Sequence, residues 1–423
     1  MSSKTKTTAT KEDGKPALVP KLRFPEFRKA EGWTEKPLKA AAHINPANGG
    51  LPESFVYIDL ESVDAGELKA KERISRVGAP SRAQRLVERG DIIYQVVRPY
   101  QRNNLLCEFD DDEDYVASTG YAQLRAKGSN RFLYQSIHTD SFVGRVIAKC
   151  TGYNYPAVNS SDLAEIHLPI PPTLPEQQKI AECLSSVDEL IAAQARKLDA
   201  LKTHKKGLMQ QLFPREGETQ PRLRFPEFQN KGEWATEPLG DLGEIVTGKT
   251  PSTKESDLWG GDILFITPTD ISEDEKYQHT TARTVIETKS TKILPVGSVV
   301  YTCIASIGKM ALTVHPSISN QQINAVVPNN KVLGEFIYYA LVNLTPWIKT
   351  IPATNTLPII NKTNFSKIAI LLPKDKTELQ RIASCLTSLD DLIAAQTQKH
   401  EALKTHKKGL MQQLFPSPEE VEA

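Results

Sequence analysis

The residues Gly243, Gly248, Lys249 and Thr250 have the spacing GxxxxGK[ST], which in nucleotide-binding proteins holds phosphates. A phosphate loop needs a buried strand before it and a helix after it. Here Pro251 follows Thr250 at once, and the next residues, STKESDLWGGD, lack the apolar spacing of a helix. The sequence therefore disfavours a nucleotide site, and an enzyme that hydrolyses nucleotides with Lys249 stays open only as a minor alternative.

The run DDDED at Asp110–Asp114 is the other cluster that could be taken for a metal or catalytic centre. Its carboxylates have no chemistry-specific spacing, and blocks of like charge are usually solvated. The five cysteines form no CxxC pair, which disfavours zinc and disulfides. We find neither the Gly-rich loop with an Asn/Asp-Pro-Pro-aromatic motif of a methyltransferase nor a carboxylate–lysine cluster of a nuclease. We therefore expect a chain that is not an enzyme, with no metal and no cofactor of its own.

Two groups of basic and amide side chains suit contact with DNA. Arginine pairs with guanine, and asparagine or glutamine with adenine, through two hydrogen bonds each. The first-half candidates are Arg73, Arg76, Arg82, Arg85, Arg98, Gln101, Arg102, Asn103 and Asn104, the last five in the loop RPYQRNN. The second-half candidates are Lys249, Thr250, Ser252, Lys254, Asn320, Gln321 and Gln322. Any one of them could equally be solvated surface or a core-capping amide, and the alternation in SNQQINAVV indicates that some amides face the interior.

Composition sets only broad limits. The chain has 423 residues, a formal net charge of +1, 39% hydrophobic and 24% charged residues, which is typical of a globular protein with more than one domain. A nucleic-acid surface must then be a local patch. No apolar run approaches the ~18 residues of a membrane span, and the N-terminus lacks a signal-peptide core. We expect a cytoplasmic protein with a disordered tail at 1–19.

The elements that must position these residues are duplicated. The string LKTHKKGLMQQLFP occurs at Leu201–Pro214 and, letter for letter, at Leu403–Pro416. Upstream, 15 of 25 residues are identical between Glu176–Ala200 and Glu378–Ala402 at the same offset of 202. The shorter string LRFPEF marks the start of each repeat. This period is too long for a solenoid, so the repeated unit is a globular segment followed by a helical one.

Both helical segments have apolar residues at alternating spacings of four and three, the heptad period of a coiled coil. The seam positions are Ile180, Leu184, Val187, Ile191, Leu198 and Leu201 in the first segment and Ile382, Leu386, Leu389, Ile393 and Leu403 in the second. Each helix would have ~36 residues and a length of ~54 Å. Two identical stripes in one chain predict an intramolecular two-helix coil. The alternative is that each helix packs separately on its own globular segment.

Gln194 and Gln396 interrupt the seam at equivalent positions and are expected to fix its register. A parallel pair of helices would align the two glutamines. An antiparallel pair would place each glutamine against apolar positions of the other helix or against His400.

The globular segments differ much more from each other than the helices do. Strand-like fragments still recur, such as Gly90–Val97 beside Gly297–Ile304, and Tyr155–Leu168 aligns with Leu357–Ile370. We therefore expect two mixed, strand-rich heads that share a fold and have diverged in their loops. Near-identical helices beside diverged heads indicate a constant partner for the helices and variable targets for the heads.

Together these features resemble the specificity subunit of type I restriction–modification enzymes over nearly the whole chain. The resemblance rests on LRFPEF followed by Trp and Pro-Leu in each half, on TGKTPSTKESDLWGGDILFITPTDI (Thr247–Ile271), on SNQQINAVVP (Ser319–Pro328), and on LPIPPTLPEQQKIAECLSSVDELI with the later KKGLMQQLF. The second half fits the family pattern closely. In the first half HINPANGGLPESFVYIDL replaces the TPS…WGGD stretch, so base-reading residues cannot be carried from one half to the other.

The resemblance implies an α+β fold, in which two target recognition domains are joined by two long helices that form an intramolecular antiparallel coiled coil. The implied segments are a tail at 1–19, a first recognition domain at 20–170, a first helical spacer at 171–214, a second recognition domain at 215–372, a second spacer at 373–416 and a tail at 417–423.

The resemblance also implies partners. The chain would be a non-catalytic subunit that binds double-stranded DNA and docks two methyltransferase subunits and, through them, restriction subunits. S-adenosylmethionine, ATP and Mg²⁺ would belong to those partners. Unequal heads related by a pseudo-twofold axis would read an asymmetric two-part site, with half-sites about one DNA turn apart. A coiled-coil scaffold whose heads bind proteins remains the alternative, and steep salt dependence would separate DNA binding from it.

Overall fold

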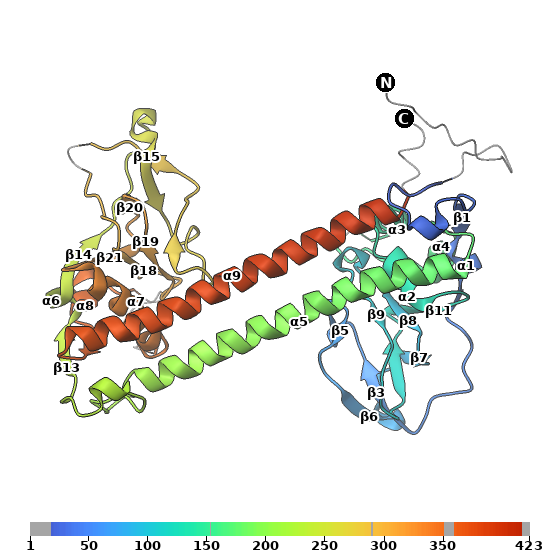
Figure 1. Cartoon of the computed structure of the whole chain (residues 1–423), viewed down its shortest axis with the longest axis horizontal. Helices are drawn as coiled ribbons and strands as arrows, with labels where there is room; N and C mark the ends of the chain where they lie inside the picture. The colour runs from blue at the N-terminus through green and yellow to red at the C-terminus, as the bar shows by residue number, and fades with distance from the viewer. Residues whose placement is uncertain (1–17, 153, 289–290, 351–358, 417–423) are drawn as a thin grey trace. The chain divides into compact units, whose positions relative to one another are not determined.

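The computed structural model of the protein describes residues 18–152, 154–288, 291–350 and 359–416 (Figure 1). The chain divides into two compact units, unit 1 (Met1–Ala193 with Glu401–Ala423) and unit 2 (Gln194–His400). The predicted tails at 1–19 and 417–423 lie outside the described residues, apart from Leu18 and Val19. Leu18 is buried and pairs with Trp33, so this part of the predicted tail is packed into unit 1.

The globular part of unit 1, called head 1, is built mainly from short strands. Its elements are η1 (Pro25–Phe27), β1 (Thr34–Pro37), α1 (Leu38–Ala41), β2 (Ala42–Ile44), β3 (Ser54–Ile58), β4 (Val63–Asp64), β5 (Glu67–Leu68), β6 (Glu72–Ser75), η2 (Arg76–Gly78), β7 (Ala83–Val87), β8 (Ile92–Gln95), η3 (Pro99–Gln101), β9 (Leu105–Leu106), β10 (Tyr115–Ser118), β11 (Tyr121–Ala126), α2 (Asn130–Ser136), α3 (Asp140–Lys149), α4 (Ser160–Ala164) and β12 (His167–Ile170). One sheet has the order β6-β3-β10-β7 and another β2-β11-β8-β9, and β1 pairs with β12.

Strand β8 lies at the centre of head 1 because both of its faces are apolar. Ile92 and Tyr94 pack in the cluster that contains Phe142 of α3. Ile93 packs on the opposite side, in the cluster that contains Val56 of β3. A continuous short apolar run is typical of a strand that is buried on both faces, so the strand predicted here is confirmed.

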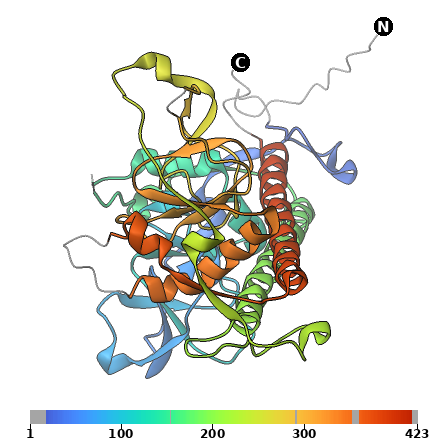
Figure 2. The ribbon, with the colours of Figure 1, turned by 90° about the vertical axis from the view of Figure 1, so that its left-hand side faces the viewer.

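The globular part of unit 2, called head 2, repeats this framework. Its elements are η4 (Pro226–Phe228), β13 (Ala235–Pro238), α6 (Leu239–Leu242), β14 (Gly243–Thr247), η5 (Ser256–Leu258), β15 (Trp259–Ile266), β16 (Tyr277–Gln278), β17 (Thr284–Val285), β18 (Val299–Thr302), β19 (Met310–Thr313), β20 (Ser317–Ser319), β21 (Ile323–Pro328), α7 (Lys331–Ile348), α8 (Lys362–Ser366) and β22 (Ala369–Leu372). The sheets are β14-β21-β18-β19-β16, β17-β15-β20 and β13-β22. Figures 1 and 2 both show η5 and the start of β15 extending from the body of head 2.

The two heads share the pairings that frame them. The antiparallel pair β1-β12 corresponds to β13-β22, and the run β2-β11-β8 corresponds to β14-β21-β18. The short helices α4 and α8 occupy the same place, and both are capped by an asparagine, Asn159 and Asn361. The recurrence of strands predicted from the two half-sequences is therefore confirmed, the shared short helices were not predicted, and the divergence lies in the remaining strands and loops.

The two predicted long helices are present as α5 (Leu174–Leu212) and α9 (Lys376–Leu414), each of 39 residues, and each contributes to both units. In unit 1, Ile180 and Leu184 near the start of α5 share a cluster with Leu414 at the end of α9. In unit 2, Leu212 at the end of α5 shares a cluster with Ile382 near the start of α9. The helices are therefore paired and antiparallel in each unit, and they also pack on the heads.

The seam is buried at the helix starts and only partly covered further along. Ile180, Leu184, Val187, Ile382 and Leu386 are buried. Ile191, Leu198, Leu201, Leu389, Ile393 and Leu403 are half-buried. A side chain that packs only against one other helix keeps part of its surface open. Ile180, Leu184, Ile382 and Leu386, by contrast, also belong to clusters that contain residues of a head.

The two glutamines meet, which corrects the expectation that antiparallel helices would separate them. Gln194 donates from Nε2 to Oε1 of Gln396 at 2.8 Å and to its carbonyl oxygen at 3.1 Å. Further along α5, Lys205 pairs with Asp390, which precedes Gln396 in α9. The antiparallel register therefore brings equivalent residues of the duplicated segments together here, and the contact satisfies the buried amide of Gln194.

No helix formed by the described residues is long and apolar enough to cross a membrane.

Candidate nucleic-acid interface

The duplicated string has the same pattern of exposure in both units. The identical residues that are exposed in each copy are Lys202, Thr203, His204, Lys206, Gln210 and Gln211 in unit 2 and Lys404, Thr405, His406, Lys408, Gln412 and Gln413 in unit 1. The three closing residues, Leu-Phe-Pro, are buried in both copies. Packing explains why the buried residues are the same, but it does not explain identity at exposed positions. The string therefore presents one exposed surface twice.

The arginine candidates of head 1 gather around the sheet β6-β3-β10-β7. Arg73 is on β6 and Arg85 on β7, the two edge strands. Arg73 is opposite Val56, and Arg85 is opposite Ala117. Val56 in turn pairs with Tyr115, two residues before Ala117. Since residues two apart or paired across strands share a face, Arg73 and Arg85 leave the same face of this sheet.

These guanidinium groups differ in how free they are. Arg76 begins η2, is exposed, and donates from Nη1 to the carbonyl oxygen of Leu51 at 3.2 Å. The exposed side chain of Arg82 contacts no hydrogen-bond or charged partner among the described residues. Arg85 is half-buried, its Nε has no hydrogen-bond partner, and burial lowers the pKa of its guanidinium. Arg82 is therefore the arginine of this group that is least occupied within the protein.

Both arginines of the loop RPYQRNN adopt left-handed backbone conformations. Their φ angles are 55° for Arg98 and 56° for Arg102, which is uncommon for residues other than glycine. The Arg98 guanidinium stacks 4.4 Å from the centre of the Tyr155 ring. Arg102 donates to the carbonyl oxygen of His138 at 3.0 Å and to Asp140 at 2.7 Å. These contacts hold the strained loop in place. The guanidinium of Arg102 is therefore used mainly in hydrogen bonds within the protein.

The inclusion of Asn104 among the candidate DNA contacts is corrected by the structure. Its side-chain amide is buried, and both of its polar atoms have partners within the protein. It is 1% exposed, its Oδ1 accepts from the backbone N–H of Gln95 at 2.8 Å, and its Nδ2 lies 3.1 Å from Nε2 of His138. Asn104 is therefore a core-capping amide and is not free to read a base. Gln101 is exposed but accepts a hydrogen bond from Gln95, and Asn103 is half-buried.

The acidic run is exposed as predicted, but it is not free. It forms three ion pairs with basic side chains of head 1. These pairs are Arg89–Asp110 at 2.7 Å, Lys71–Asp111 at 2.5 Å and Arg73–Glu113. The pairing with Lys71 holds the pKa of Asp111 below its usual range. One of the candidate arginines, Arg73, is therefore neutralised by the segment that looked like a catalytic cluster.

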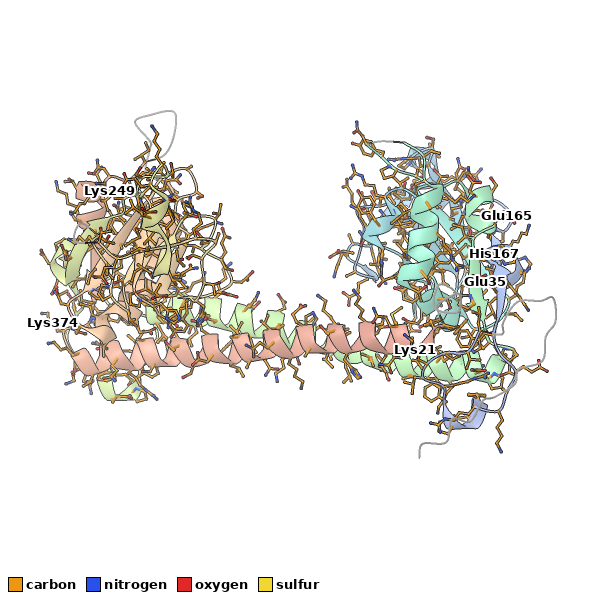
Figure 3. The ribbon with its side chains drawn as sticks, turned by 90° about the horizontal axis from the view of Figure 1, so that it is seen from above. Lys21, Glu35, Glu165, His167, Lys249 and Lys374 are labelled. Atoms are coloured by element: carbon orange, nitrogen blue, oxygen red, sulfur yellow. The ribbon has the colours of Figure 1, made fainter. Side chains whose placement is uncertain are left out.

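Three head 2 candidates, Lys249, Thr250 and Ser252, line one hollow of about 630 Å³. Lys249 is exposed on head 2 (Figure 3). The hollow also contains Ser319, whose buried Oγ has no hydrogen-bond partner. Lys254 is exposed nearby in sequence, and its side chain has no ion-pair partner among the described residues. The stretch from 249 to 254 is therefore the more accessible group of head 2 candidates.

Asn320 is a second correction. It is 8% exposed, its Oδ1 accepts from the backbone N–H of Gln322, and its Nδ2 donates to Oε1 of Gln322 at 3.0 Å. The side chain of Asn320 is therefore used within the protein, and its partner Gln322 is half-buried. Gln321 is exposed and accepts from Thr250 Oγ1 at 2.7 Å. The alternation noted in SNQQINAVV thus indicated correctly that some of these amides face the interior.

The segment with the GxxxxGK[ST] spacing lacks the geometry of a phosphate loop. Gly243 begins β14 rather than following a strand, and Thr250 lies in a loop. The next helical element is η5, a three-residue 3-10 turn.

No group of three or more His, Cys, Asp or Glu in the described ranges is arranged to hold a metal ion.

The sequence is similar to that of known proteins over much of its length. Residues 106–203 and 231–405 match the family described as the type I restriction modification DNA specificity domain. The type I restriction enzyme MjaIX specificity subunit of Methanocaldococcus jannaschii is 31% identical over 179 residues, which span 41% of each chain. The HindI specificity subunit of Haemophilus influenzae is 24% identical over 365 residues, or 70% of this chain and 79% of that one.

A solved structure has the same fold. The crystal structure of the type I restriction-modification S subunit from M. genitalium covers 95% of this chain and 100% of its own, with a TM-score of 0.62 and 17% identity. Because the family match covers more than half of the chain, the protein belongs to the family of type I restriction-modification DNA specificity subunits. The predicted α+β fold and the family expected from the sequence are therefore confirmed.

Proposed function

We propose that this protein selects the DNA site of a type I restriction-modification complex, with each head reading one part of an asymmetric two-part site. It catalyses no reaction itself and acts in the cytoplasm. S-adenosylmethionine, ATP and Mg²⁺ serve the partner subunits. Membership in the specificity family supports the choice of DNA over protein targets for the heads.

The helices dock two copies of a methyltransferase subunit and, through them, restriction subunits. The observation that carries this proposal is the duplicated string, whose exposed residues are identical in both copies while the heads have diverged. A surface that serves only solvent would be free to vary. Two copies of one partner need the same surface twice.

The test uses charge reversal within the exposed string. His204 and His406 are equivalent, exposed, and without ion pairs among the described residues. His204→Glu and His406→Glu should each remove one of two docked methyltransferase copies, and the double variant should remove both, as measured by native mass spectrometry of the co-expressed complex. The control is Arg196→Glu with Gln398→Glu, at exposed positions where the two copies differ. Equal loss of docking in the control would overturn the proposal for the string.

DNA recognition is tested separately. Deletion of the gene should remove one adenine-methylation pattern with a two-part sequence from the host, as read by methylome sequencing. Binding of the assembled complex to that sequence should weaken steeply between low and moderate salt, because phosphate contacts release counterions. An unchanged methylome together with salt-insensitive binding to proteins would favour a coiled-coil scaffold instead.

A further inference from the structure

Three elements of unit 2 meet at the carboxylate of Asp390 on α9. Its Oδ1 accepts from Nζ of Lys205 on α5. Its Oδ2 accepts from the hydroxyl of Tyr339 on α7 at 2.5 Å. The side chains of Lys205 and Asp390 are only 19% and 17% exposed. One carboxylate therefore links head 2 to both long helices at the same point.

The same arrangement occurs in unit 1 at Asp188, the equivalent of Asp390 in the duplicated sequence. Its Oδ1 lies 2.7 Å from Nζ of Lys407, the equivalent of Lys205. Its Oδ2 accepts from Nε2 of Gln135 on α2 of head 1 at 2.8 Å. The carboxylate again joins two long helices and one head.

The heads supply different side chains for the same bond. The aspartate and the lysine are identical in the two copies, whereas the donor from the head is a tyrosine in unit 2 and a glutamine in unit 1. Two diverged heads thus retain a neutral donor to one carboxylate. A hydrogen bond to a charged group is stronger and more directional than a neutral one, so it restrains the head against rotation on the helices.

The restraint is more extensive in unit 2. Lys276, which is 7% exposed, forms an ion pair with Glu335 of α7. Its Nζ also donates to the hydroxyl of Tyr339 at 3.1 Å and to Oγ1 of Thr387 on α9 at 2.7 Å. The contacts of Asp390 therefore belong to a network that spans head 2 and α9, whereas Asp188 has two partners, Gln135 and Lys407, among the described residues.

We propose that Asp188 and Asp390 are positioning residues, each of which fixes the angle of one head on the helices of its own unit. They thereby set how strictly the protein discriminates the spacing between the two parts of its DNA site. When a head is held at a fixed angle, binding a half-site at the wrong spacing requires that its contacts with the helices be distorted, which lowers the affinity. When the head is held less tightly, this distortion requires less free energy. The inference rests on the proposed DNA-recognition function and adds the residues that govern spacing.

The experiment removes the donor from the head. In Tyr339→Phe the acceptor that Nζ of Lys276 uses at 3.1 Å is lost as well, although Lys276 keeps Glu335 and Thr387 as partners. Tyr339→Phe and Gln135→Met leave both aspartate–lysine pairs intact. The controls are Tyr338→Phe, whose hydroxyl makes no hydrogen bond to the described residues, and Gln178→Met at an exposed position of α5. The full-length variants are titrated with duplexes that carry the methylome-derived site, or the same site with one base pair added or removed between its two parts.

We expect the affinity ratio between correct and altered spacing to fall roughly tenfold in Tyr339→Phe and in Gln135→Met, the scale of one hydrogen bond to a charged group. Base preference within each half-site should stay unchanged, and so should the ratio in both controls. Asp390→Asn, which keeps the shape of the side chain, should reproduce the effect if Tyr339→Phe folds poorly. A spacing ratio equal to that of the controls would overturn the inference, whereas a wild-type protein that binds no two-part site would overturn the proposed function itself.

Discussion

Arg23 and Glu176, 153 residues apart in the sequence, form a buried ion pair with two hydrogen bonds, Nε to Oε1 at 2.7 Å and Nη2 to Oε2 at 2.8 Å. The guanidinium also donates to the carbonyl oxygens of Ala30 and Glu31. The arginine of LRFPEF therefore ties the segment before head 1 to the first turn of α5. Unit 2 repeats the pair as Arg224 with Glu378.

Replacing Arg23 by Met should destabilise unit 1 by roughly 3–5 kcal/mol, because it leaves the Glu176 carboxylate buried and unpaired. Urea unfolding followed by tryptophan fluorescence measures the change. Arg196→Met, on an exposed part of α5, is the control and should change stability by less than about 0.5 kcal/mol. Equal midpoints for the two variants would mean that the buried pair contributes nothing net.

The duplication supplies a second comparison, at the tryptophans that follow the two LRFPEF strings. Trp33 donates from Nε1 to Oε1 of Glu176 at 3.0 Å, whereas the buried Nε1 of Trp234 has no hydrogen-bond partner. Phenylalanine removes the N–H and the same volume at both sites. Trp33→Phe should therefore lower the free energy of unfolding by roughly 2 kcal/mol more than Trp234→Phe does. The first substitution removes a hydrogen bond to a charged group, whereas the second removes an N–H that has no partner. Thermal unfolding of the two variants checks the order, and a smaller loss at Trp33 would contradict it.

The parts of this fold that could be predicted depend on local patterns. The heptad spacing and the repeated string predicted both long helices and their pairing, since periodicity is set by neighbours along the chain. The role of Arg23 was missed, because LRFPEF served only to mark the repeat and its partner Glu176 lies far away in sequence. The meeting of Gln194 with Gln396 was missed because it depends on the antiparallel register.

The candidate contacts were harder to predict for a related reason. Asparagine and glutamine suit both adenine and the protein's own backbone, and their type does not reveal which of these they bind. Asn104 and Asn320 are used internally, whereas Arg82 and Lys254 remain exposed without partners among the described residues. A candidate list drawn from residue types therefore contains both kinds, and only the packing of the loops separates them.

The stability of unit 1 should depend on pH through His138. Burial of its ring, which lies beside Tyr134 and Asn104, lowers the pKa of His138 from 6.5 to about 4. The unfolded chain then binds the proton more readily than the folded one. The contribution is therefore complete above about pH 6.5 and is lost as the pH falls from there toward 4.

A shift of this size corresponds to at most roughly 3 kcal/mol. His138→Gln should reduce the acid sensitivity of unfolding between pH 6.5 and 4, whereas His43→Gln, at an exposed position, should leave the profile of the wild type. The measurement is the urea midpoint as a function of pH. Parallel pH profiles for His138→Gln and the wild type would show that another group governs the acid transition.

The acidic run of head 1 should weaken non-specific DNA binding, because its carboxylates pair with Lys71, Arg73 and Arg89 in place of DNA phosphates. Neutralising the run with Asp110→Asn, Asp111→Asn and Glu113→Gln frees these three cations. Affinity for DNA without the recognition sequence should rise, and the slope of log K against log salt should steepen by about 0.9 for each freed cation that contacts a phosphate.

The control for this triple variant removes three negative charges elsewhere in unit 1, by Glu26→Gln, Glu61→Gln and Glu182→Gln, at exposed positions without ion pairs among the described residues. Net charge then changes equally in both proteins, so long-range attraction rises by a similar amount. Only the variant of the acidic run should steepen the salt slope, since that slope counts local phosphate contacts. Identical slopes in the two triple variants would show that the three basic side chains do not face DNA.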